Sequence, residues 1–168
     1  PAAVGGLTTD QFVALTPDAI GALTTAQVAG LTTAQLAKLT TGQQATLTSA
    51  QVAALTSKQA VALSTAQVKA FSTEQVRALS TSVMQSLTTS QIQAFEIEDF
   101  ANLTNVQVGA LTSTQLKALT TAEIASLTND QVRAISPAAV GGLTTDQFLA
   151  LTPETISGLT TAQIAGLT

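Results

Sequence analysis

Large apolar residues recur at every eighth position of this chain, from residue 7 to residue 167, without an insertion or a deletion. We number this residue position one of an octad, and Leu23 to Gly30 (LTTAQVAG) is a typical example. A second apolar residue occupies position six of nearly every octad, and position eight is mostly Ala or Gly. Position one is Leu except at Phe71, Phe95 and Ile135. The chain is therefore one short unit repeated throughout its length.

The polar residues between the two apolar positions are those that begin a helix. Thr24, at position two, can accept a hydrogen bond from the backbone N–H three residues later, as an N-cap does. Gln27, at position five, can reach back to the backbone N–H of Thr24 and complete a capping box. Leu23 and Val28 have the spacing of a hydrophobic staple around that cap. We predict a helix of about six residues and a two-residue connection in each octad.

Two other structures could accommodate an eight-residue period. A continuous helix would need about 4.0 residues per turn, well above the natural 3.6, and would place β-branched Thr inside it every two turns. A β-solenoid is the second alternative because Thr and Val favour strands. Positions one and six, however, have an odd separation and would point to opposite faces of a strand. The pattern favours short helices, with a β-solenoid as the alternative.

Helices this short cannot be stable alone in water, because nucleation costs too much. Each octad must bury its apolar residues against neighbours, as in other solenoids. Odd and even octads look alike, so one screw operation should relate each helix to the next. We therefore predict an all-α solenoid, a superhelix with one short capped helix per octad. The pattern leaves open its handedness and the number of octads per turn.

Some octads depart from the regular pattern. Gln44 places an amide at position six and Ala60 shrinks that position, so both should be soft spots. Where position three is Pro, a residue suited to the first helical position, position five is never Gln. We interpret this as loss of a backbone N–H near position three that the Gln side chain would otherwise bind. The four prolines are Pro1, Pro17, Pro137 and Pro153.

Residues 95–102, FEIEDFAN, form the most irregular octad. The octad lacks the Thr cap and the Gln, and it carries Glu96, Glu98 and Asp99. Ca²⁺ needs six to eight oxygen ligands, and the Gly turn of an EF-hand loop is absent here. We interpret the segment as a degenerate octad rather than a metal site, with Phe95 and Phe100 repacking the core locally.

We predict that residues 1–168 form a single uninterrupted array. Residues 1–32 and 137–168 differ at six positions only, so a unit of 136 residues has been copied within the array. The start within an octad and the absence of an initiator Met predict a fragment of a longer array. Charged residues should lie at positions four and seven on the solvent side, as do Lys58, Lys69, Glu74 and Arg77.

Composition removes most chemistry from consideration. The chain has no His, Cys, Tyr or Trp, which excludes the usual nucleophile–base pairs and soft metal ligands. We predict no enzyme activity, no catalytic, cofactor-binding or metal site, and no cofactor. Gly5–Gly6 and Gly141–Gly142 fall at helix ends, where Gly is common, and not in a phosphate loop. The net charge of −4 without a basic run argues against nucleic-acid binding, and no apolar stretch is long enough for a membrane span.

The octad L-[TS]-[TS]-x-Q-[VI]-x-[AG] resembles arrays in very large exported proteins of Gram-negative bacteria, described as adhesion-type or haem-utilisation exoproteins. The resemblance covers the whole chain and implies an extracellular or cell-surface location. It transfers no functional residue. Haem binding has no support in the residues, since His and Tyr are absent and the single Met, Met84, lies at a core position.

Two functions fit these observations. The first is a structural spacer or stalk that holds another domain away from a surface. The second is a repetitive binding surface for ice or carbohydrate, built from arrayed Thr side chains. Capping explains the Thr at position two, and a flat hydroxyl lattice should not tolerate Pro at position three, so we favour the spacer. Expected partners are neighbouring repeats, with head-to-tail self-association of the array.

Overall fold

The computed structural model describes residue 4 and residues 6–167, and within them the chain is all-α. Each helix has four to six residues, one helix falls in each octad, and the described residues contain no strand. The predicted fold class is confirmed. The helices are α2 (Thr9–Val13), α3 (Pro17–Gly21), α4 (Thr25–Ala29), α5 (Thr33–Lys38), α6 (Thr41–Ala45), α7 (Ser49–Ala53), α8 (Ser57–Val61), α9 (Thr65–Lys69), α10 (Thr73–Ala78), α11 (Thr81–Ser86), α12 (Thr89–Ile92), α13 (Ile97–Asn102), α14 (Asn105–Gly109), α15 (Ser113–Ala118), α16 (Thr121–Ala125), α17 (Asn129–Ala134), α18 (Pro137–Val140), α19 (Thr145–Leu149), α20 (Pro153–Ser157) and α21 (Thr161–Ala165).

Each of these helices begins at position three, directly after an N-cap at position two that is Thr or Ser, except in α13, where the N-cap is Glu96. Helix α4 is typical. The Thr24 hydroxyl accepts from the backbone N–H of Gln27 at 3.2 Å, and Gln27 Oε1 accepts from the backbone N–H of Thr24 at 2.8 Å. These two bonds satisfy donors that a helix N-terminus leaves free. The start of each helix is thus determined by residues three apart in the chain.

The helices end without a left-handed residue. Gly30, at position eight of its octad, has φ −87°, and no described residue has a positive φ. In some octads the small residue of position eight is required because successive turns pack closely there. A Cβ on Gly142 would lie 2.3 Å from the carbonyl oxygen of Ser113, and one on Gly166 would lie 2.3 Å from that of Pro137. In both cases the neighbour is 29 residues earlier, in the preceding turn.

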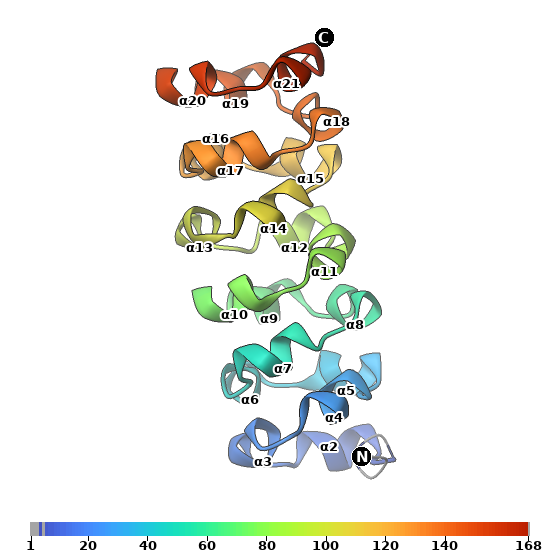
Figure 1. Ribbon diagram of the computed structural model, residues 1–168. Coiled ribbons are helices and arrows are strands. Elements are labelled where there is room, and N and C mark those ends of the chain that lie inside the picture. Colours follow the sequence, from blue (N-terminus) through green and yellow to red (C-terminus); the bar gives the residue numbers. More distant parts are fainter. Residues whose placement is uncertain (1–3, 5, 168) are drawn as a thin grey trace. The chain divides into compact units, whose positions relative to one another are not determined.

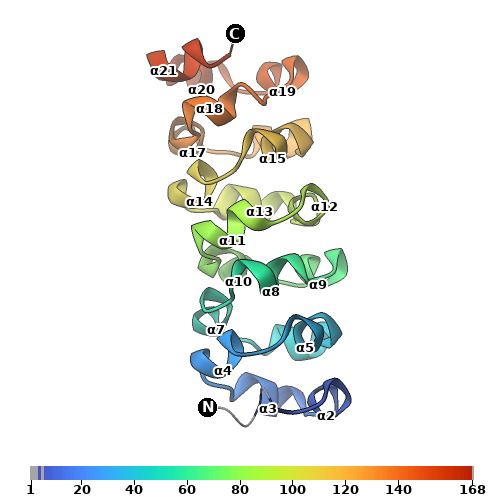
Figure 2. The same ribbon diagram turned by 90° about the vertical axis from the view of Figure 1, so that its right-hand side faces the viewer.

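The chain divides into two compact units, Pro1–Leu87 and Thr88–Thr168. Within each unit, a helix packs on the helix three octads later (Figures 1 and 2). In the first unit the packed series are α2–α5–α8–α11, α3–α6–α9 and α4–α7–α10. In the second unit they are α12–α15–α18–α21, α13–α16–α19 and α14–α17–α20.

The position-five glutamines join successive turns. Gln59 Nε2 donates to the carbonyl oxygens of Val28 and Leu31, each at 2.9 Å, which lie 31 and 28 residues earlier. Helices three octads apart pack against each other, and these hydrogen bonds connect a glutamine with the C-terminal end of the helix four octads earlier. One turn therefore takes between three and four octads. Bonds to the carbonyl 28 residues earlier and to a second one 31 residues earlier are also made by Gln35, Gln67, Gln75, Gln131, Gln147 and Gln163. In Gln43 and Gln51 the second carbonyl lies 30 residues earlier, at position seven.

The interpretation of the Pro–Gln correlation was wrong about the donor. The Gln Oε1 accepts from the N–H of position two, as Gln147 does from Thr144 at 2.8 Å, and not from an N–H near position three. Pro at position three removes neither this donor nor the carbonyls that Nε2 binds. Nothing in the structure explains why Gln is absent after Pro17, Pro137 and Pro153, and Pro1 lies outside the described residues.

The core consists of positions one and six, with the glutamine of position five packed beside them. Val28, Val76 and Val132 are fully buried, and most position-one residues are nearly so. Charged side chains at positions four and seven are exposed, as predicted for Lys58, Lys69, Glu74 and Arg77.

Candidate functional site

The irregular octad keeps the architecture of its neighbours with different side chains. Asp99 takes the place of Gln, is buried, and accepts from the backbone N–H of Glu96 through Oδ2 at 2.9 Å. Glu96 and Glu98 are exposed. The Phe95 and Phe100 rings pack edge to face with centroids 6.1 Å apart, and both are buried. The buried carboxylate thus has a capping role in α13.

Among the described residues, no group of three or more His, Cys, Asp or Glu side chains could hold a metal ion. None of the helices that the structure describes has the length and apolarity that crossing a membrane requires. The cap hydroxyls also have a local role, since Thr112 accepts from the backbone N–H of Gln115 at 3.2 Å. A hydroxyl oxygen that accepts this hydrogen bond is held at the N-terminus of its own helix.

Gln44 is a buried polar residue in the core of the first unit. Its Nε2 donates to the carbonyl of Gln67, but its buried Oε1 has no hydrogen-bond partner. A buried acceptor without a partner costs about 1–3 kcal/mol. The other predicted soft spot, Ala60, is fully buried at position six, whereas Val61 beside it is 45 % exposed. The apolar residue of that octad thus lies at position seven instead of position six and does not fill the core.

Gln44→Leu should raise the free energy of unfolding by about 1 kcal/mol, because it removes the unpaired acceptor and adds apolar contact. The carbonyl of Gln67 keeps the N–H of Ala70 as a donor at 3.2 Å. Gln43→Leu is the matched control. Gln43 donates to the carbonyls of Val13 and Leu15 at 2.9 and 2.8 Å, so the same substitution one residue earlier should destabilise. Denaturant unfolding midpoints that move in the same direction would contradict this assignment.

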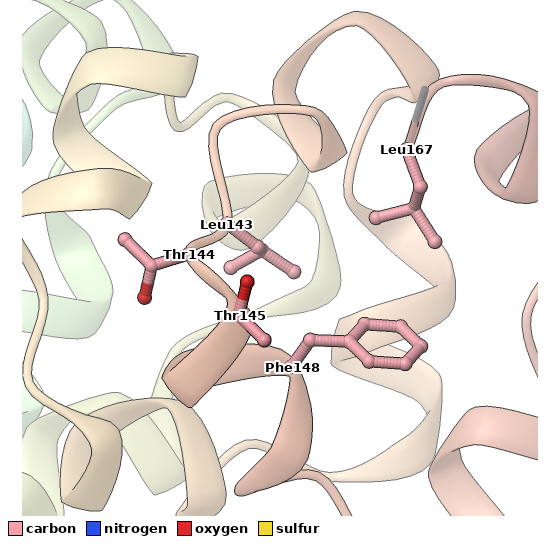
Figure 3. A pocket seen from close by; sticks show the side chains of 5 residues that line it. All are labelled: Leu143, Thr144, Thr145, Phe148 and Leu167. Atoms are coloured by element: carbon pink, nitrogen blue, oxygen red, sulfur yellow. The ribbon is translucent and has the colours of Figure 1, made fainter.

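The second unit has an open apolar hollow at its last turn. Its volume is about 230 Å³, and it is lined by Leu143, Thr144, Thr145, Phe148 and Leu167. In Figure 3 the side chains of Leu143, Phe148 and Leu167 face a common space. None of the described residues that line it has a charged or titratable side chain. This lining can accept apolar side chains and offers no group for acid–base chemistry.

A wider hollow of about 470 Å³ lies in the first unit, over helices α5, α8 and α11. Its wall includes the exposed Val61 and the side chain of Lys58. The lining residues are Thr33, Ser57, Lys58, Val61 and Ser86. Sequence reasoning indicated neither hollow, because each depends on residues from different turns. The sequence predicted that the Gln of position five caps its own helix, but not that its Nε2 binds the preceding turn.

A family model described as the ALTTAQ repeat matches residues 12–41, 20–49, 60–89, 92–129 and 124–161. The matched residues include most of the chain and cover both units. No curated protein matches this chain.

Proposed function

Because the chain belongs to the ALTTAQ repeat family, we propose that it is a non-catalytic structural repeat region that acts as an elongated spacer or stalk in a large exported protein. The observation that carries this proposal is the series of position-five glutamines that join each turn to the preceding one, which we call the glutamine ladder. Each Gln of the ladder caps its own helix and also binds the preceding turn, as Gln163 does with the carbonyls of Val132 and Ile135 at 2.8 and 2.9 Å. The polar chemistry of the repeat therefore serves to hold turns together.

The exposed positions support the same proposal. Position three is occupied by residues as different as Thr25, Asn105, Ile97 and Pro153. A spacer needs only a soluble outer surface, so it tolerates this variety, whereas a site for a particular ligand would require defined side chains. An extracellular or cell-surface location follows from the resemblance to exported arrays and is part of the proposal.

A distance measurement tests the spacer. The chain has no Cys, so Thr25→Cys with Thr161→Cys, and Thr25→Cys with Thr65→Cys as control, give two clean pairs for fluorescent labels. These pairs span 17 and 5 octads. For a stack in which each unit contacts near neighbours only, the first distance should be about three times the second. Single-molecule energy transfer at nanomolar concentration measures both. Similar distances, with a radius of gyration near the compact value of about 15 Å, would reject the spacer.

The alternative is a binding surface of arrayed Thr side chains for ice or carbohydrate. The cap hydroxyls of position two count against it, because they are held by backbone N–H groups of their own helices. Thermal hysteresis of the purified chain distinguishes the two functions, since a clear positive result would favour the ice-binding surface.

A further inference from the structure

The hollow of the first unit has an apolar wall although most of its residues are polar. It lies over α5, α8 and α11, which pack in one column (Figure 1). The atoms exposed on its wall are nearly all carbon. The hydroxyls of Ser57 and Ser86 are engaged within the fold, since they donate to the carbonyls of Ser82 and Val83 at 3.0 and 2.8 Å. The wall therefore presents the carbon atoms of these serines together with the side chain of Val61, which is 45 % exposed.

The surroundings of this hollow are positively charged. Lys58 lines it, and the other charged residue on the three helices is Lys38, so they carry two positive charges and no acidic residue. Both lysines are exposed, and neither forms an ion pair within the residues that the structure describes. The hollow therefore fits an apolar side chain that is accompanied by a carboxylate.

The irregular octad of the second unit presents such a side chain. Ile97 is 52 % exposed, and Glu96 and Glu98 on either side of it are exposed acidic residues. Apart from Pro, Ile97 is the only aliphatic residue at position three in the whole sequence. Position three is buried in none of the octads that the structure describes, so the fold itself does not require an aliphatic side chain there. Val106, which is also exposed in this unit, has no acidic residue on either side.

We propose that Ile97 of one copy of this chain inserts into the hollow beside Val61 of a second copy, where Glu98 pairs with Lys58. Burial of the isoleucine supplies the affinity, and the ion pair determines the orientation. The partner is a second copy because this chain carries both the positively charged hollow and the exposed isoleucine with its acidic neighbours. The contact joins different surfaces of the two copies, so it is heterologous.

Charge reversal tests the ion pair without disturbing the fold. Position four naturally holds both Lys58 and Glu74, so Lys58→Glu and Glu98→Lys should both fold. Each variant alone brings like charges together and should weaken association about fivefold. The double variant brings opposite charges together again and should regain the affinity of the unmodified chain. Glu74→Lys is the matched control, because it makes the same substitution at position four of an octad that does not line the hollow.

Ile97→Ser tests the apolar part of the contact. Ser occupies position three at Ser49 and Ser113, so the fold tolerates it there. The loss of a buried isoleucine side chain should weaken association at least about tenfold. Val106→Ala is the control. Val106 is 69 % exposed in α14, the next helix of the same unit, and Ala is common at its position four, so the affinity should not change.

Sedimentation equilibrium of the 168-residue chain over a range of concentrations, at low ionic strength so that the ion pair is little screened, measures the association. A monomeric unmodified chain would leave the hollow to another occupant and overturn the proposal. Association that Ile97→Ser or the single charge reversals leave unchanged, or that the double variant does not regain, would overturn it as well. Failure here would leave the spacer function intact, since a spacer does not require self-association.

Discussion

Phe100→Ala should lower the free energy of unfolding by about 3–5 kcal/mol, the usual cost of removing a fully buried aromatic ring. Phe100 is 0 % exposed and packs edge to face on Phe95 in the irregular octad. The loss combines apolar contacts with the cavity left behind, because the short connections on either side of α13 give the neighbouring helices little freedom to collapse into it. Equilibrium unfolding in guanidinium chloride, followed by far-ultraviolet circular dichroism, measures the change.

Ile97→Ala is the control for Phe100→Ala. Ile97 lies three residues earlier in the same helix but is 52 % exposed, so its truncation should change stability by no more than about 0.5 kcal/mol. Equal losses of unfolding free energy in the two variants would mean that packing of the aromatic pair does not stabilise the irregular octad. Its acidic residues would then need another explanation.

Gln131→Ala should cost about 3 kcal/mol, because it removes hydrogen bonds at a buried junction. Gln131 Nε2 donates to the carbonyls of Phe100 and Leu103 at 2.9 and 2.7 Å, and its Oε1 accepts from the N–H of Thr128 at 2.6 Å. Truncation leaves two carbonyls of α13 and its connection without this donor in a region that water does not reach. The same unfolding experiment measures the loss.

Gln93→Ala provides the comparison for Gln131→Ala. Gln93 also bridges two turns, donating to the carbonyl of Ala118 at 2.6 Å, but it lies at position seven and is exposed. Water can replace its hydrogen bond, so the cost should stay below about 1 kcal/mol. Equal losses would mean that the ladder contributes through helix propensity and not through the junction between turns.

The local structure of this protein follows from residues that are close in sequence. The cap at Thr24 and its reciprocal bond with Gln27 involve residues three apart, so the pattern alone predicted where α4 begins. The burial of positions one and six and the exposure of positions four and seven also follow from the geometry of one helical turn. The all-α solenoid could therefore be predicted before any coordinates were known.

Only the tertiary structure decided how the turns fit together. Oε1 of Gln59 has a partner three residues away, but its Nε2 binds Val28 and Leu31, and no local pattern indicates a separation of 28 to 31 residues. The same separation explains Gly142. Its lack of a side chain makes room for the backbone of Ser113, and its φ is not in the left-handed region. Packing between turns also buries Oε1 of Gln44 where no donor reaches it. These features arise from the number of octads per turn, which packing between whole helices determines and a single octad does not encode.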